Sequence, residues 1–264
     1  MTTRSALITV MIAAAQKAGR ALVRDFGEVE QLQVSKKGPA DFVSAADHKA
    51  ERIVREELSR ARPRYGFLME EAGAITGADT SNRWIVDPLD GTTNFLHGIP
   101  HFAVSIALER DAELVAGVVY SPVHDELFWA EKGKGAVLNG RRLRVSARTS
   151  LDSALFATGI PFMGRRDHEL FLKQLAHVMG ATAGVRRFGS AALDLAYVAA
   201  GRYDGFWETG LQPWDIAAGI VLVREAGGFV SDLGGEPTMM DSGDILAANV
   251  SLRDSLARLL HAAR

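Results

Sequence analysis

The chain has 264 residues, a formal net charge of −2 and a hydrophobic content of 47%. Its length lies between one large domain and two small ones, and its apolar content is ample for a buried core. The near-neutral charge excludes a general electrostatic attraction to nucleic acid or anionic membranes, and the absence of cysteine excludes a disulfide framework, a thiolate metal site and a cysteine nucleophile.

The chain begins with an apolar run at residues 6–15 that follows Arg4 and loosely resembles a signal peptide. Its apolar residues recur at helical spacing, however, and the pattern continues past Gln16 and Lys17 to Phe26. We therefore expect a packed amphipathic first helix. No run approaches the ~20 apolar residues that a membrane span requires, so we expect a cytoplasmic protein with no membrane association.

The rest of the first half predicts one more helix and then a sheet. Ser44 and Asp47 resemble a capping box and start a helix that ends before Pro63. Runs rich in β-forming residues predict strands at 66–69, 84–86, 102–108, 114–120, 126–130 and 136–143. The last run contains Asn139-Gly140, a strong hairpin signal. Up to about residue 140 we expect two helices followed by a largely antiparallel sheet.

The second half predicts shorter strands that alternate with helices. The expected strands lie at 154–158, 205–208 and 245–248, and the expected helices at 167–178, 191–200, 213–225 and 252–261. Pro213 suits the first turn of a helix, and Gly227-Gly228 ends that helix. Periodicity alone gives an α+β or α/β fold class. No linker divides the chain, so we expect a single domain, 1–264, with two lobes of roughly 1–140 and 141–264.

The most informative segment is RWIVDPLDGTTNF at residues 83–95. Residues 84–86 predict a buried strand, which Pro88 is expected to end. Two carboxylates, Asp87 and Asp90, follow directly. Carboxylate oxygens bind hard cations such as Mg2+, so the pair predicts a metal site. The alternative for an isolated D-x-x-D-G is a strand-end cap and a turn residue.

The residues after these carboxylates predict a phosphate site. Gly91 permits a tight turn, and Thr92 or Thr93 can cap the helix that follows. Free N–H groups at a helix start bind phosphate. One short segment therefore offers both halves of a metal-assisted phosphate site.

The full string resembles a signature of the inositol monophosphatase family, D-P-hydrophobic-D-G-T-T-N-F. A second family signature, W-D-x-A-A-G followed by E-A-G-G, stands at 214–219 and 225–228, and a Glu70-Glu71 pair precedes the first. The three elements occur in family order. The resemblance implies a layered α-β-α-β-α sandwich of the sugar-phosphatase type. It also implies a Mg2+-dependent phosphomonoesterase that hydrolyses inositol 1-phosphate.

The metal ligands follow from the same resemblance. One ion would be held by Glu70, Asp87 and the backbone carbonyl of Leu89, and a second by Asp87, Asp90 and Asp215, with a third, weaker ion near Glu70. All-oxygen ligation suits Mg2+, and Mn2+ is a plausible substitute. Outside this context, Glu70 resembles a surface acid and Asp215 a helix-start acid.

The resemblance implies catalysis by a water molecule that Thr92 and Asp47 orient and activate, with Glu70 also among the catalytic residues. A metal-bound water is easier to deprotonate, and two cations can clamp the attacking and leaving oxygens. Residues 41–47 follow the family's D-x-V-T-x-x-D pattern, with serine in place of threonine. For Asp47 the alternative is helix capping. Lys36 matches a lysine on a mobile flap, although Lys37 makes the match ambiguous.

The substrate residues also follow from the family pattern. Backbone N–H groups of Gly91 and Thr92 would hold the phosphate, and Glu208 would accept a hydrogen bond from an inositol or sugar hydroxyl. The segment Gly189-Ser190-Ala191 would line the leaving-group side, and Asp90 would also contact the substrate. Fructose 1,6-bisphosphate, histidinol phosphate and adenosine 3′,5′-bisphosphate remain alternative substrates, although Glu208 would repel a second phosphate.

For partners, the resemblance implies a homodimer and inhibition by Li+. A role in RNA metabolism or transcription is an alternative, because some bacterial relatives have one. The densest basic run, Arg141, Arg142, Arg144 and Arg148, lacks interleaved aromatic residues and is interpreted as a solvated face. Arg186 and Arg187 are interpreted as a solvated or dimer-facing pair; the alternative is that they compensate the repulsion between Glu208 and a second phosphate. The glycine-rich strings do not form a dinucleotide-binding G-x-G-x-x-G.

Overall fold

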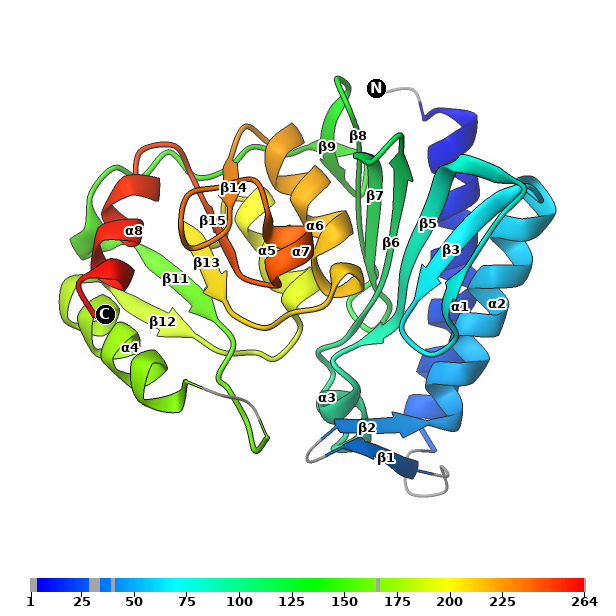
Figure 1. The fold of residues 1–264 in the computed structure, drawn as a ribbon, viewed down its shortest axis with the longest axis horizontal. Coiled ribbons are helices and arrows are strands. Elements are labelled where there is room, and N and C mark those ends of the chain that lie inside the picture. The colour runs from blue at the N-terminus through cyan, green and yellow to red at the C-terminus, as the bar shows by residue number, and fades with distance from the viewer. Residues whose placement is uncertain (1–3, 29–33, 39–40, 165–166, 264) are drawn as a thin grey trace.

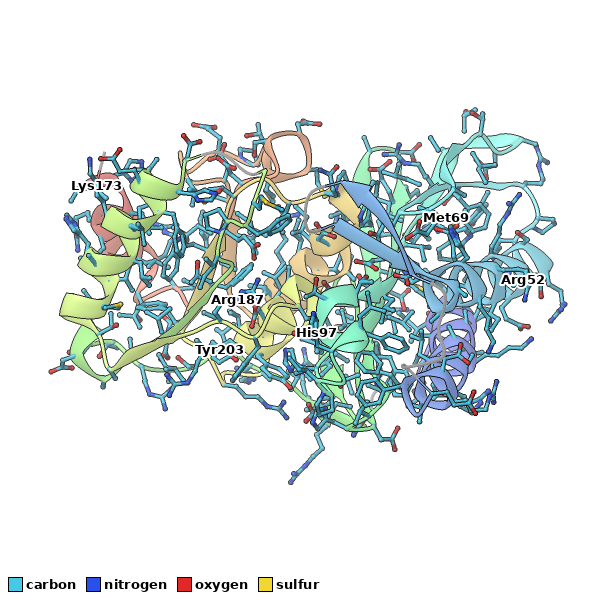
Figure 2. The ribbon with its side chains drawn as sticks, turned by 90° about the horizontal axis from the view of Figure 1, so that it is seen from below. Arg52, Met69, His97, Lys173, Arg187 and Tyr203 are labelled. Atoms are coloured by element: carbon cyan, nitrogen blue, oxygen red, sulfur yellow. The ribbon has the colours of Figure 1, made fainter. Side chains whose placement is uncertain are left out.

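The computed structural model describes residues 4–28, 34–38, 41–164 and 167–263, and for 34–38 and 41–44 it describes the backbone alone. Five layers follow one another across the molecule: two helices, a large sheet, two helices, a smaller sheet and two helices (Figure 1). The layered α-β-α-β-α arrangement expected from the family resemblance is confirmed. Arg52 on the first outer layer and Lys173 on the last lie at opposite ends of the molecule (Figure 2).

The first layer consists of α1 (Ala6–Phe26) and α2 (Ala45–Ala61), which pack against each other and on the large sheet. Ser5 caps α1 by accepting a hydrogen bond from the Ile8 N–H at 3.2 Å. Helix α1 is long and apolar enough, by length and composition, to cross a membrane. Its apolar face is instead part of the core between α2 and the sheet. The expected packed amphipathic helix is therefore confirmed.

The large sheet has the strand order β10-β9-β8-β7-β6-β5-β3-β4. All neighbouring strands are antiparallel except β3 and β5. The strands are β3 (Tyr65–Met69), β4 (Gly73–Ile75), β5 (Asp79–Asp90), β6 (Ala103–Arg110), β7 (Glu113–Ser121), β8 (Glu126–Glu131), β9 (Gly135–Leu138) and β10 (Arg141–Arg142). Asn139 and Gly140 both have positive φ between β9 and β10, which confirms the expected hairpin.

The expectation that Pro88 ends its strand is wrong. Strand β5 continues to Asp90, and its register against β6 shifts between Asp87 and Asp90. A bulge of this kind accommodates a proline, because the missing N–H falls where the ladder is already interrupted. The bulge thus places both carboxylates on the end of one strand.

The middle layer consists of α5 (Ala191–Ala199) and α6 (Pro213–Glu225), whose apolar residues form a core with both sheets. A Cβ on Gly117 of β7 would lie 2.6 Å from the carbonyl oxygen of Ala218, so the strand and α6 pack with their backbones in close approach. The expected starts of both helices are confirmed. This layer brings the first turn of α6 close to the end of β5.

The smaller sheet has the order β12-β11-β13-β15-β14. Its strands are β11 (Leu155–Thr158), β12 (Gly184–Arg186), β13 (Gly205–Glu208), β14 (Phe229–Ser231) and β15 (Ile245–Ala248). Helices α4 (His168–Ala181) and α8 (Arg253–His261) cover its outer face and share a third core with it. Short elements complete the fold: β1 (Val34–Gly38), β2 (Asp41–Ser44), α3 (Thr92–Leu96), a 3-10 turn (Leu151–Ser153) and α7 (Met239–Ser242).

Candidate active site

The turn after β5 is built by Gly91, whose φ of 97° lies in the left-handed region. A Cβ there would lie 3.0 Å from the carbonyl oxygen of His101, so both conformation and space favour glycine. Gly91 itself is the residue before α3, and no side chain caps that helix. The expectation that Thr92 or Thr93 caps it is therefore wrong.

The Thr92 hydroxyl is directed to two other acceptors. Its Oγ1 lies 3.0 Å from Asp47 Oδ1 and 3.1 Å from the carbonyl oxygen of Leu89. Asp47 lies in the first turn of α2 and is fully buried. The structure thus joins the two residues expected to activate a water molecule, and it places Leu89, an expected metal ligand, beside them.

Asp90 links the large sheet to the middle helical layer. Its Oδ2 accepts hydrogen bonds from Ser190 Oγ at 2.6 Å and from the backbone N–H of Ala192 at 2.7 Å. Both donors lie at the start of α5. The Ser190 hydroxyl also caps this helix by accepting a hydrogen bond from the Leu193 N–H. Asp87, 2% exposed, accepts a hydrogen bond from the Leu89 N–H at 2.9 Å. The bulge and the start of α5 therefore fix the orientation of both carboxylates.

Asp215 and Glu70 approach this pair from α6 and from the end of β3. The Oδ2 atom of Asp215 accepts a hydrogen bond from the Gln212 N–H at 2.7 Å, as in a capping box. Glu70 follows β3, and its N–H donates to the carbonyl oxygen of Val86 at 3.2 Å. Glu51, which the sequence reasoning missed, holds the next residue, since its Oε2 accepts from the Glu71 N–H at 2.9 Å.

These acids perturb one another strongly. Burial, followed by the charges of Glu70, Asp90 and Asp215, raises the pKa of Asp87 well above its usual range. Burial and the charge of Asp90 do the same to the pKa of Asp215, which keeps more contact with solvent than Asp87. Burial raises the pKa of Asp90 to about 6 against the opposing effect of its Ser190 and Ala192 hydrogen bonds. Several acids thus share one poorly solvated region.

The donor set fits hard divalent cations. Four carboxylates interact through space here, and a cation would offset the repulsion that raises their pKa values. Among the side chains that the structure describes, in 4–28, 45–164 and 167–263, no three His, Cys, Asp or Glu residues form a ready-made metal group. The hydrogen bonds described above use one oxygen of each aspartate, Oδ1 of Asp87 and Oδ2 of Asp90 and Asp215, and a carboxylate has a second oxygen that can bind a cation.

One cavity of about 280 Å³ is lined by all of the expected substrate residues. Its lining includes Asp90, Gly91, Thr92, Gly189, Ser190, Ala191, Glu208 and Asp215. Arg187 is exposed, as expected for a solvated residue, and also lines this cavity near the middle of the molecule (Figure 2). The expected flap residue Lys36 lies in β1, and its side chain is outside the described part of the chain.

The sequence reasoning also missed buried polar residues around the site. Asp194, one turn into α5, is 1% exposed, and burial and the charges of Glu208 and Asp90 raise its pKa well above the usual range. Asp194 lies within an otherwise apolar helix and belongs to no recognisable motif, so the sequence did not indicate that it lies near the site. By contrast, Arg141, Arg142, Arg144 and Arg148 are exposed, as expected for a solvated face.

Comparisons with known proteins identify the family and several similar proteins. The model of the inositol monophosphatase family matches residues 3–264. An inositol-1-monophosphatase of Mesorhizobium japonicum is 62% identical over 97% of this chain and 96% of its own. A Nus factor SuhB of Pseudomonas aeruginosa is 47% identical over 92% and 91%. The crystal structure of extragenic suppressor protein SuhB from Bartonella henselae superposes with a TM-score of 0.95 at 60% identity, covering 97% of this chain and 98% of that one.

Proposed function

The chain belongs to the inositol monophosphatase family and is a phosphatase, and from that premise we propose that it is a Mg2+-dependent phosphomonoesterase that hydrolyses inositol 1-phosphate to inositol and phosphate. The observation that carries the proposal is the meeting, beside one cavity, of a buried carboxylate cluster and the hydrogen-bonded pair Thr92–Asp47. The first can bind cations, and the second can position a nucleophile.

We propose that Glu70, Asp87, Asp90, Asp215 and the carbonyl oxygen of Leu89 hold two or three Mg2+ ions, with Mn2+ as a substitute. When bound, such ions would neutralise the charge of the phosphate ester and lower the pKa of water. The protein's own contribution is placement. The β5 bulge, the residue after β3 and the start of α6 bring carboxylates from three segments together, and the start of α5 orients Asp90.

Thr92 and Asp47 would act on the attacking water. The Thr92 hydroxyl has one proton, which the structure directs to Asp47 Oδ1 and the Leu89 carbonyl oxygen. Its lone pairs can therefore accept a hydrogen bond from water. As the water oxygen attacks phosphorus, its proton passes to Thr92 Oγ1 while the Thr92 proton passes to Asp47. The bond from phosphorus to the alcohol oxygen breaks, and that oxygen takes a proton from solvent.

The remaining cavity residues would bind the ester. The backbone N–H groups of Gly91 and Thr92 would hold the phosphate. Glu208, with Gly189, Ser190 and Ala191, would face the alcohol, and a carboxylate there favours a neutral polyol over a second phosphate. We also propose that the chain is one domain of two lobes that works as a cytoplasmic, Li+-sensitive homodimer, as the family resemblance implies.

Phosphate release with and without Mg2+ tests the function. The panel holds inositol 1-phosphate, fructose 1,6-bisphosphate, histidinol phosphate, glycerol 2-phosphate and adenosine 3′,5′-bisphosphate. We expect Mg2+-dependent release with the highest kcat/KM for inositol 1-phosphate. Preference for another ester would retain the chemistry and change the substrate. Failure to cleave any ester would overturn the proposal and favour the role suggested by relatives named Nus factor SuhB.

A further inference from the structure

Helix α2 presents two buried carboxylates, Asp47 and Glu51, which lie four residues apart. Side chains at this spacing lie on the same face of a helix, one turn apart. Asp47 accepts the hydrogen bond of the Thr92 hydroxyl. Glu51, which is 7% exposed, instead accepts hydrogen bonds from the loop that carries Glu70. One face of α2 therefore contacts both a residue proposed to act on water and the loop of a residue proposed to hold a cation.

The loop spans residues 70–72 and connects the antiparallel strands β3 and β4. All of its backbone N–H groups have acceptors in other parts of the chain. The Glu70 N–H donates to a carbonyl oxygen of β5 at 3.2 Å. The N–H groups of Glu71 and Ala72 both donate to Glu51 Oε2, at 2.9 and 3.4 Å. Loops are usually more mobile than the strands they connect, and these three hydrogen bonds hold this one in place.

The fixed loop matters because the Glu70 carboxylate lies near other carboxylates. Burial is the largest cause of the raised pKa of Asp87, and the charge of Glu70 is the next. Two like charges at close range repel each other, so the loop must resist a force that drives Glu70 away from Asp87. Without the acceptor on Glu51, two adjacent N–H groups of the loop would lose their hydrogen bonds, and Glu70 would be free to move outward.

We propose that Glu51 is a positioning residue for cation binding, which fixes the loop 70–72 so that the Glu70 carboxylate stays beside Asp87. The inference rests on the proposed Mg2+-dependent function and deepens it. Residues that orient a metal ligand commonly change metal affinity by about tenfold to a hundredfold when they are replaced. Because Glu51 acts through Glu70, its replacement should weaken the binding of Mg2+ and leave the binding of the ester nearly unchanged.

Three substitutions separate the position of the acceptor from its charge. Glu51→Gln keeps an oxygen that can accept from an N–H group and removes the charge. Glu51→Leu has a similar size and removes both. Glu51→Asp keeps the charge and moves the carboxylate back by one methylene group. A positioning role therefore requires that the glutamine variant resemble wild type and that the other two be impaired.

The test measures Mg2+ binding in the absence of substrate. The Tm as a function of Mg2+ concentration gives an apparent Kd for wild type and each variant. We expect Glu51→Leu and Glu51→Asp to raise this Kd about tenfold to a hundredfold, and Glu51→Gln to stay within about threefold of wild type. The matched control Glu56→Leu, which removes an exposed acid from the same helix, should leave the Kd unchanged. If Glu51→Leu does not fold, Glu51→Asp carries the comparison.

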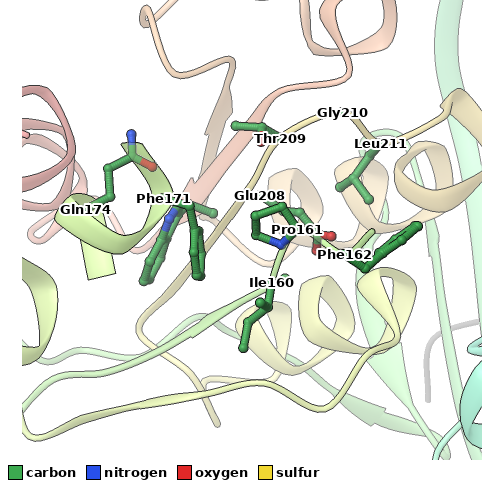
Figure 3. A pocket seen from close by; sticks show the side chains of 11 residues that line it. Ile160, Pro161, Phe162, Phe171, Gln174, Glu208, Thr209, Gly210 and Leu211 are labelled. Carbon is green, nitrogen blue, oxygen red and sulfur yellow. The ribbon is translucent and has the colours of Figure 1, made fainter. Parts of the chain in front are cut away.

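Steady-state phosphate release gives a second measurement. The Mg2+ concentration for half-maximal rate should rise in parallel with the Kd. At saturating Mg2+ the KM for inositol 1-phosphate should stay within about twofold of wild type. The proposed alcohol end of the cavity lies beside the smaller sheet, where Glu208, Phe162 and Leu211 line it (Figure 3). Those residues are remote from α2 (Figure 1), so the substitutions should not disturb them.

Two results would overturn the positioning role. One is a lowered Tm in EDTA with an unchanged Mg2+ Kd, which would mean that Glu51 only stabilises the hairpin. The other is an equal loss of affinity in Glu51→Gln and Glu51→Leu, which would assign the effect to charge. If wild type binds Mg2+ but cleaves no ester, the proposed function fails, and the Kd values still decide the role of Glu51. If the Tm of wild type does not respond to Mg2+, both proposals fail.

Discussion

Thr92 Oγ1 and Asp47 Oδ1 lie 3.0 Å apart, although 45 residues separate them in the chain. Thr92 begins the short helix α3 after the β5 bulge, and Asp47 lies in the first turn of α2. The hydrogen bond therefore joins the outer helical layer to the end of the large sheet at the candidate active site. Because Asp47 is fully buried, the Thr92 hydroxyl is its route to the cavity.

This relationship predicts that the two residues act as a unit. Thr92→Ala should lower kcat for inositol 1-phosphate by about 10²- to 10⁴-fold, the usual contribution of a positioned acid–base group. Thr92→Ser keeps the hydroxyl and should retain most activity. Asp47→Asn should resemble Thr92→Ala, and the double variant should be little worse than either alone. Steady-state phosphate release checks this, with Thr80→Ala, exposed on β5, as control. Additive losses would refute the unit.

Much of this site could be predicted from the sequence, because its residues lie in short contiguous motifs. Asp87, Asp90 and Thr92 belong to one string, and Asp215 follows a proline that marks a helix start. Their meeting could not be derived from periodicity, since the Asp90–Ser190 hydrogen bond spans 100 residues. Only the resemblance to a family anticipated it.

Other features were beyond the sequence reasoning. Pro88 predicts a strand end when its missing N–H is considered alone, but the β5 bulge removes the need for that N–H. Glu51 and Gln174 lie on helices where a polar residue usually faces solvent, and each faces inward instead. Which side of a helix is buried depends on the layers around it, and these come from distant parts of the chain.

The carboxylate cluster predicts opposite responses of activity and metal-free stability. The pKa of Asp87 is raised in the folded state, so the folded protein favours the protonated carboxyl group. The pKa of an aspartate in an unfolded chain is about 4. The free energy of unfolding should therefore fall as the pH rises above that value. Asp87→Asn removes that penalty. At pH 7 in EDTA we expect the variant to have a higher Tm than wild type, while kcat in Mg2+ falls at least about a hundredfold.

The same variant should respond less to metal. Wild-type Tm should rise on adding Mg2+ because binding to the folded state alone stabilises it, and the rise should shrink in Asp87→Asn. Thermal unfolding with and without Mg2+ measures both effects. Asp152→Asn, which removes an acid from the 3-10 turn outside the cluster, serves as control. Near-normal activity of Asp87→Asn would contradict the proposed role of this residue.

His101 predicts a loss of stability in mild acid. Burial, with a smaller effect from His124, lowers its pKa from 6.5 to about 4. Its ring packs 5.1 Å from that of Phe188, and its Nε2 has no partner among the described residues. The folded state therefore resists protonation, so stability present above pH 6.5 is lost as pH falls toward 4.

Replacing that imidazole should remove the effect. Between pH 7 and about 4.5, wild type should lose about 1 to 2 kcal/mol more unfolding free energy than His101→Leu, allowing for partial exposure of the ring. Urea unfolding at the two pH values gives the difference. His177→Leu removes an exposed imidazole and should behave as wild type. Identical pH dependence in His101→Leu and wild type would show that the ring is protonated freely in the fold.

Glu225 predicts a stability effect that leaves catalysis unchanged. Glu225 is the last residue of α6. Its two carboxylate oxygens accept hydrogen bonds from the N–H of Gly133, in the turn before β9, at 2.8 Å and from the N–H of Gly135, the first residue of β9, at 2.7 Å. Asp215 lies ten residues earlier on the same helix, about 15 Å away at 1.5 Å per residue.

Glu225→Ala should lower the free energy of unfolding by about 1 to 2 kcal/mol, because two charge-assisted hydrogen bonds are lost. The KM for inositol 1-phosphate should stay within about twofold of wild type, because the first turn of α6 is held separately by Gln212. Urea unfolding and steady-state kinetics on Glu225→Ala, with the exposed Glu236→Ala as control, check both parts. A large rise in KM without loss of stability would mean that the far end of α6 helps to shape the cavity.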